Sequence, residues 1–133
     1  MPLKKIQKTA RAILNALDFP DGELSILLVD DQQIAQLNQT YLNRKGPTNV
    51  IAFAMREGQF TEITPNLLGD VVISMETARS EAEAAQLGLE NRFNQLLIHG
   101  ILHLLGYDHE QSNAEAERME KMSNSLLMML HEE

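Results

Sequence analysis

The segment that most constrains the fold is residues 96–105, where every side chain is large and apolar except two histidines and one glycine. A helix that is apolar on nearly all sides has no face to turn toward water, so it must lie inside a core. We therefore expect a central buried helix here, with the other elements packed around it. This helix would carry His99 and His103, two of the four histidines in the chain.

The spacing of these two histidines predicts that their side chains lie on one side of the helix. Residues four apart differ by about 40° around the helix axis, and their Cβ atoms lie about 5–6 Å apart. Two imidazoles at that separation can bind one ion at Zn–N distances of about 2.0–2.1 Å. Gly106 can end the helix in a left-handed conformation, which lets His109 return to the same ion. Arg92 and Gln95 share this polar sector of the helix.

The three histidines are interpreted as ligands of a metal. A single buried histidine is more often a hydrogen-bonded core residue, but burying several imidazoles costs free energy unless each has a partner. The chain has no cysteine, so nitrogen or oxygen atoms must hold any metal. Three nitrogen ligands leave a fourth position for water, as in catalytic zinc sites. We therefore expect a hydrolase with one Zn²⁺ per chain at His99, His103 and His109, and other divalent transition metals also suit these ligands.

Length and composition indicate one globular domain over residues 1–133. Acidic residues outnumber basic residues by 19 to 11, which argues against indiscriminate nucleic-acid binding but leaves room for a local basic patch. The absence of cysteine suits a reducing compartment. No stretch approaches the ~20 apolar residues that span a bilayer, so we expect a soluble, cytoplasmic protein that does not bind membranes.

Hydrophobic periodicity and capping signals predict alternating helices and strands. The first expected helix covers residues 3–17. The second is introduced by Asp30 or Asp31 and carries Ile34, Leu37 and Tyr41. The other three cover residues 75–87, 90–105 and 113–130. Gly88 is expected to end the third helix, and residues 112–115 to form a capping box for the last. The expected strands cover residues 23–29, 49–55 and 67–75, with residues 60–63 as a candidate for a further short strand. The pattern predicts an α+β fold with a small sheet and about five helices.

Three sequence blocks resemble one known family. HGILHLLGYDH, residues 99–109, matches the H-G-x-L-H-L-x-G-Y-D-H signature of the YbeY family of bacterial rRNA maturation factors. PTNVIAF at 47–53 is similar to that family's P-T-D-V-L-S-F, and LGDVVIS at 68–74 to its L-G-D-I-V-I-S. The likeness in order and spacing runs from about Leu27 to the end of the last helix. This chain departs from the family pattern at Leu42, where the family has Arg, and at Asn49, where it has Asp.

The resemblance implies an α+β fold with a small mixed sheet against helices, and a metal at the three histidines. It implies a single-strand-specific endoribonuclease that matures the 3′ end of 16S rRNA and acts in ribosome quality control. The implied partners are single-stranded or ribosomal RNA, the small ribosomal subunit and its assembly factors, and no DNA. Arg44, two residues beyond the position of the family arginine, is the candidate for contacting a phosphate and offsetting transition-state charge.

Two other functions are compatible with the same residues. The spacing of the histidines and Gly106 also fits the metzincin proteases, but Gly100 stands where their glutamate base would be, so a protease is the weaker hypothesis. A ribosome-assembly binding module with a structural metal is the other alternative. Asp70 and Asp108 are candidates for orienting a ligating histidine, and each could instead satisfy nearby backbone N–H groups.

Overall fold

The computed structural model describes residues 1–55, 66–108 and 110–132. Over these residues the chain forms five helices and three strands, in the order α1 (Leu3–Ala16), β1 (Glu23–Val29), α2 (Asp31–Leu42), β2 (Val50–Ala54), β3 (Leu67–Ser74), α3 (Met75–Ala85), α4 (Leu89–Leu104) and α5 (Asn113–His131). The predicted α+β class is confirmed. The candidate strand at 60–63 and His109 lie outside the described residues.

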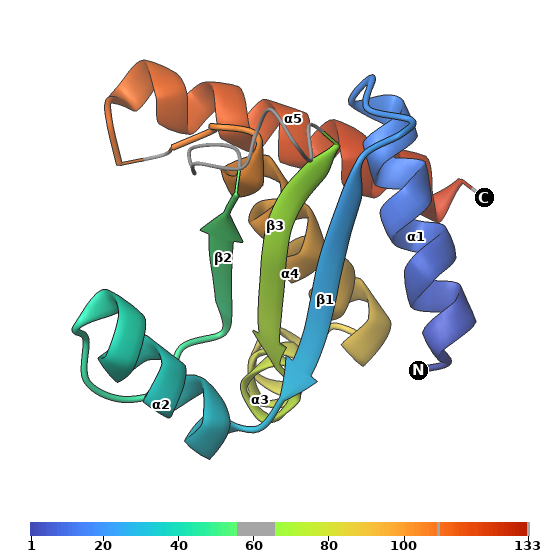
Figure 1. Ribbon diagram of the computed structural model, residues 1–133. Coiled ribbons are helices and arrows are strands. Elements are labelled where there is room, and N and C mark those ends of the chain that lie inside the picture. Colours follow the sequence, from blue (N-terminus) through green and yellow to red (C-terminus); the bar gives the residue numbers. More distant parts are fainter. Residues whose placement is uncertain (56–65, 109, 133) are drawn as a thin grey trace.

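The sheet is mixed, and β3 is its central strand. The strand order is β1-β3-β2, with β1 parallel and β2 antiparallel to β3. The β3 side chains at Val71, Val72 and Ile73 are at most 1% exposed, because this strand has a neighbour on each edge and is covered on both faces. Figure 1 shows β3 between the other two strands, with α4 lying across one face of the sheet.

Helix α4 is the buried helix expected from the apolar segment. Nine of its 16 residues are buried, Phe93, Leu97, Ile101 and Leu102 completely. At Gly100 this helix lies so near the sheet that an added Cβ would be 2.6 Å from Cγ1 of Val71. The glycine at this position therefore lets the helix pack directly on the central strand.

Local capping explains most element boundaries, with one correction. Asp30 forms a capping box with Gln33 at the start of α2, and the Ser112 hydroxyl accepts from the Glu115 N–H at the start of α5. The sequence suggested that Gly88 ends α3, and this is wrong. Gln86 ends it in the left-handed conformation, at φ 57°, and Gly88 is the N-cap of α4. The helix ends earlier because the Gln86 N–H already bonds back to the last-turn carbonyls.

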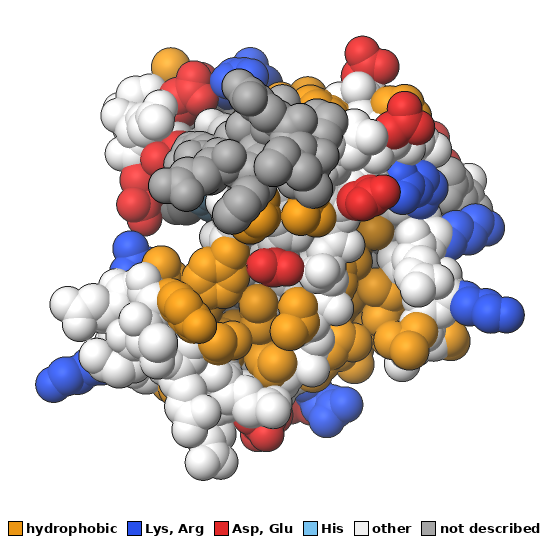
Figure 2. Space-filling model, in the orientation of Figure 1, with side chains coloured by type: hydrophobic (Ala, Val, Ile, Leu, Met, Phe, Trp, Pro, Cys, Tyr) orange, Lys and Arg blue, Asp and Glu red, His pale blue; other side chains and the backbone are white. Residues whose placement is uncertain are grey.

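The sheet face opposite to α4 is partly covered by α2. Ile34 of α2 packs there on Ile51 and Val72, and Figure 2 shows hydrophobic side chains gathered over this face. Leu27 of β1 stays 43% exposed because α2 does not extend across the whole sheet. Within the part of the chain that the structure describes, no helix has the length and apolar character needed to cross a membrane.

Candidate metal and RNA-binding site

His99 and His103 lie one turn apart on α4 with their rings turned toward each other. Their Nε2 atoms are 3.0 Å apart, and their ring centroids are 4.5 Å apart at an interplanar angle of 67°. Both side chains are half-buried. The predicted convergence of the two imidazoles is therefore confirmed, and the nitrogen that donates between them depends on the tautomer of each ring.

The geometry of these two nitrogens fits a shared metal ion. Two ligands of a tetrahedral zinc ion at about 2.0–2.1 Å lie about 3.3 Å from each other, which is close to the observed 3.0 Å. Among the described residues, no group of three His, Cys, Asp or Glu side chains surrounds one point. Because His109 is not among them, the three-histidine metal site stays a prediction.

His99 and His103 line a pocket of about 500 Å³. Its walls come from residues 48–52, which lead into β2, from α4 at Gly100, and from the turn that follows α4. Gly106 adopts φ 96° there, so the chain reverses after α4 and brings Asp108 and Glu110 to the same pocket. A glycine favours this left-handed conformation because it has no Cβ.

Arg44 is brought to this pocket by the loop between α2 and β2. Its exposed side chain lines the pocket that also contains His99 and His103, although 55 and more residues separate them in sequence. Asn43 makes this approach possible by ending α2 in the left-handed conformation, at φ 54°, and the Arg44 N–H then bonds to the Asn38 carbonyl. The guanidinium therefore borders the space in front of the histidine pair.

Of the two aspartates considered as partners of a histidine, Asp70 lies away from the pair and Asp108 lies in the turn that lines the same pocket. Asp70 is next to Val71 on β3, and Val71 faces Gly100 of α4. Because side chains alternate along a strand, Asp70 faces the opposite side of the sheet, away from α4, and cannot orient His99 or His103. Asp108 accepts a hydrogen bond from the Glu110 N–H at 2.9 Å, so it stabilises the turn after α4.

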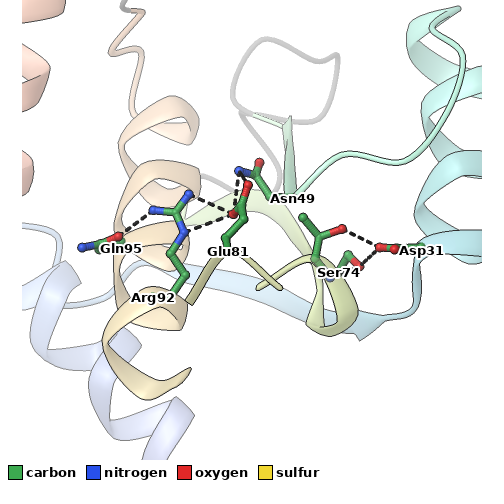
Figure 3. Close-up of polar contacts among 7 residues, drawn as sticks. Asp31, Asn49, Ser74, Glu81, Arg92 and Gln95 are labelled. Atoms are coloured by element: carbon green, nitrogen blue, oxygen red, sulfur yellow. Dashed lines mark hydrogen bonds and ion pairs between the residues drawn. The ribbon is translucent and has the colours of Figure 1, made fainter. Parts of the chain in front are cut away.

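A polar network borders the other side of His99. Glu81 of α3 accepts hydrogen bonds from Arg92 Nε and Nη2 at 3.1 and 2.9 Å, and from Asn49 Nδ2 at 3.3 Å. Arg92 Nη1 donates to Gln95 Oε1 at 2.6 Å. Figure 3 shows Glu81 between Arg92 and Asn49. The sequence placed Arg92 and Gln95 beside the histidines, but nothing in its local pattern indicated that Glu81 and Asn49 would join them.

A second polar cluster joins α2 to α3 away from the histidines. The hydroxyl groups of Ser74 and Thr77 both donate to Oδ1 of Asp31, each at 2.5 Å (Figure 3). These hydrogen bonds stabilise the ionised carboxylate, and they lower the pKa of Asp31 below its ordinary value. This cluster holds α2 against the start of α3, and its residues do not line the pocket at the histidines.

Comparison with known proteins supports the resemblance seen in the sequence. A family model described as Endoribonuclease YbeY matches residues 1–131 of the chain. A protein of that name from Syntrophotalea carbinolica is 49% identical over 132 residues, which cover 98% of this chain and 88% of the relative. One from Geobacter sulfurreducens is 47% identical over 128 residues, covering 96% of this chain and 85% of the relative.

One solved structure has the same fold. A Thermotoga maritima protein determined in solution aligns with a TM-score of 0.63 and 22% sequence identity, covering 98% of this chain and 84% of that chain. At that identity the likeness supports the fold alone.

Proposed function

The chain belongs to the endoribonuclease YbeY family, a family of RNA-cleaving hydrolases, and on that premise we propose that it is a metal-dependent, single-strand-specific endoribonuclease. We assign it to ribosomal RNA processing at the 3′ end of 16S rRNA and to ribosome quality control in the cytoplasm, with the small ribosomal subunit and its assembly factors as partners. The observation that carries the proposal is the 3.0 Å separation of the His99 and His103 Nε2 atoms within a pocket that Arg44 also lines.

In this proposal His99, His103 and His109 hold one Zn²⁺ per chain. A divalent cation at that position would supply Lewis-acid activation of water near neutral pH and would offset charge on a phosphoryl group. The half-buried rings of His99 and His103 suit such a role because their orientation is fixed by the packed helix that carries them.

The chain's own residues then bind and orient the RNA. The exposed guanidinium of Arg44 has the planar set of donors that matches two oxygens of one phosphate. The pocket between β2 and α4 receives a backbone whose bases are unstacked, which favours a single strand. Arg44 would therefore hold the phosphate that lies in front of the histidine pair.

The protease alternative conflicts with the packing of α4. A peptide-cleaving site of the metzincin type places a glutamate base at position 100. In this fold any Cβ at Gly100 would lie 2.6 Å from a methyl group of Val71, which is fully buried. A glutamate cannot occupy that position without separating α4 from the sheet.

Cleavage of RNA tests the proposal against a binding module with a structural metal. Zn²⁺-loaded protein is incubated with a single-stranded fragment from the 3′ end of 16S rRNA and with the same fragment annealed to its complement. His103→Ala is the test variant, and His131→Ala, at the exposed end of α5, is the matched control. We expect cutting of the single strand by the wild type and by His131→Ala, and at least a 100-fold loss in His103→Ala.

Two results would contradict this expectation in different ways. Equal cutting by His103→Ala and the wild type would mean that the histidines are not needed. RNA binding without cutting by metal-loaded protein would favour the binding module. Metal analysis of protein purified without a histidine tag provides an independent check, since we expect one equivalent of metal in the wild type and a loss of metal in His103→Ala.

A further inference from the structure

A second pocket, of about 330 Å³, lies beside the histidine pair and has no role in the function proposed above. We propose that this pocket binds one nucleobase of the RNA strand, next to the phosphate held at the histidines. The inference rests on the proposed function for its ligand, because it extends the same RNA-binding surface. The two pockets share Asn49, Val50 and His99, so a group in one is adjacent to a group in the other.

The walls of this pocket match the faces of a flat ring. Val50 of β2, Leu96 of α4 and Leu127 of α5 give it apolar sides. Ligand pockets commonly combine apolar walls with a few polar groups that fix the orientation of the ligand. Its volume is at the small end of the range of about 300–1,000 Å³ that such pockets span, which suits a single base.

The polar groups present an acceptor and a donor with fixed orientations. Asn49 donates its Nδ2 to Glu81, so its Oδ1 is left to accept a hydrogen bond. Gln95 accepts from Arg92 through Oε1, so its amide N–H groups are left to donate. Watson–Crick edges carry donors and acceptors side by side, and unstacked bases are read through these edges in single-stranded RNA.

The electrostatics of the pocket favour a base over a phosphate. Arg92 is the only arginine or lysine among the described residues that line it, and its guanidinium forms an ion pair with Glu81 at 2.9 Å. The two charges compensate each other, so the pocket presents hydrogen-bonding groups without a net positive charge. A neutral ring suits this environment better than an anion. The phosphate is better placed in the neighbouring pocket, where Arg44 forms no ion pair with another described residue.

Binding of mononucleotides to the metal-free protein tests the pocket directly. The side-chain amide signals of Asn49 and Gln95 are followed by NMR during titration with the four nucleoside 5′-monophosphates and with ribose 5-phosphate. We expect these signals to shift with at least one nucleotide and not with ribose 5-phosphate. Equal shifts with ribose 5-phosphate, or no shift with any nucleotide, would overturn the proposal.

A near-isosteric variant isolates the amide donor. Gln95→Glu keeps an oxygen for Arg92 and replaces the amide nitrogen with a second oxygen. We expect about a tenfold loss of affinity for the preferred nucleotide, the scale of one lost hydrogen bond. Gln36→Glu, at an exposed position of α2, adds the same charge outside the pocket and is the matched control. Wild-type affinity in Gln95→Glu would count against the pocket.

A second variant guards against an effect of charge alone. Ser123→Phe places an aromatic ring in the same pocket without changing charge, and we expect it to abolish the nucleotide-dependent shifts. Amide shifts that persist in a folded Ser123→Phe protein would overturn the assignment. The native fold of each variant is checked by circular dichroism.

These measurements separate the pocket from the proposed function. If nucleotides shift the Gln95 and Asn49 amides but metal-loaded protein cuts no RNA, the proposed function fails and the base pocket stands. If the protein cuts RNA with no preference for any base beside the cut, and the amides do not shift, the proposed function stands and the pocket fails.

Discussion

The close contact between Gly100 and Val71 predicts that Gly100→Ala changes the free energy of unfolding. The sign of that change depends on which residue occupies position 71. In Gly100→Ala the new methyl would lie 2.6 and 3.2 Å from the two methyl groups of Val71. Carbon atoms prefer about 3.5–4.0 Å, so α4 must move by about 1 Å. Val71 is fully buried on the central strand and, as a β-branched residue, has few alternative rotamers.

Two opposing effects set the size of this change. Overpacking a core costs about 1–3 kcal/mol, and we take the upper value of about 3 kcal/mol because the clash is with a confined side chain. Alanine in a helix interior is favoured over glycine by about 1 kcal/mol. We therefore expect Gly100→Ala to lower the free energy of unfolding by about 2 kcal/mol.

Removing the obstructing methyl groups should reverse the sign. Val71→Ala alone should cost about 2–3 kcal/mol, from lost burial and the cavity left behind. In that background Gly100→Ala should be stabilising by about 1 kcal/mol, because the clash is gone and the helix preference remains. The resulting coupling between the two positions is about 3 kcal/mol.

Urea unfolding of the four proteins, followed by circular dichroism, measures this coupling. Gly88→Ala is the control without a clash, because no heavy atom apart from those of its chain neighbours lies within 4 Å of an added Cβ there. Gly88 is the N-cap of α4, where glycine is preferred over alanine, so we expect a cost of about 0.5–1 kcal/mol that is the same with and without Val71→Ala. A Gly100→Ala protein as stable as the wild type, or a coupling below about 0.5 kcal/mol, would refute the packing argument.

Three other predictions concern the ends and links of the helices. The pKa of Asp31 is lowered in the folded state, so its ionised carboxylate contributes its full stabilisation above the ordinary carboxyl pKa of about 3.9. In urea unfolding across pH, Asp31→Asn should be less stable than the wild type at neutral pH. This difference should shrink as the pH falls through the lowered pKa. Ser112→Ala should cost about 1 kcal/mol in the same assay through loss of the α5 cap. Arg11→Gln loses hydrogen bonds to two backbone carbonyls and should cost about 0.5–1.5 kcal/mol more than Lys8→Gln, which removes an equal charge.

Local patterns in the sequence predicted most helices and strands, because interactions between neighbouring residues decide where these elements form. The helix from Leu3, the strand from Glu23 and the cap at Ser112 are all in the structure. The end of α3 was misplaced because Gly88 seemed the natural C-terminal residue, whereas Gln86 adopts the left-handed conformation without being glycine. The energetic cost of that conformation for a non-glycine residue is small enough for local hydrogen bonds to offset.

The site was predicted in part. The i, i+4 spacing placed His99 and His103 together, and the structure confirms their convergence. The orientation of Asp70 was not decided by the sequence, because it depends on which sheet face α4 covers. The network of Glu81 with Arg92 and Asn49 joins α3, α4 and the loop before β2, and no local spacing encodes such a contact.

The sequence by itself determined that a buried helix would present two imidazoles from one side, because helical periodicity and apolar composition are properties of neighbouring residues. The tertiary structure decided what faces those imidazoles. The strand order β1-β3-β2 and the close packing of α4 at Gly100 bring Arg44 and Asn49 to the pocket that the pair lines. These contacts join residues distant in sequence, so they depend on how the elements pack as a whole.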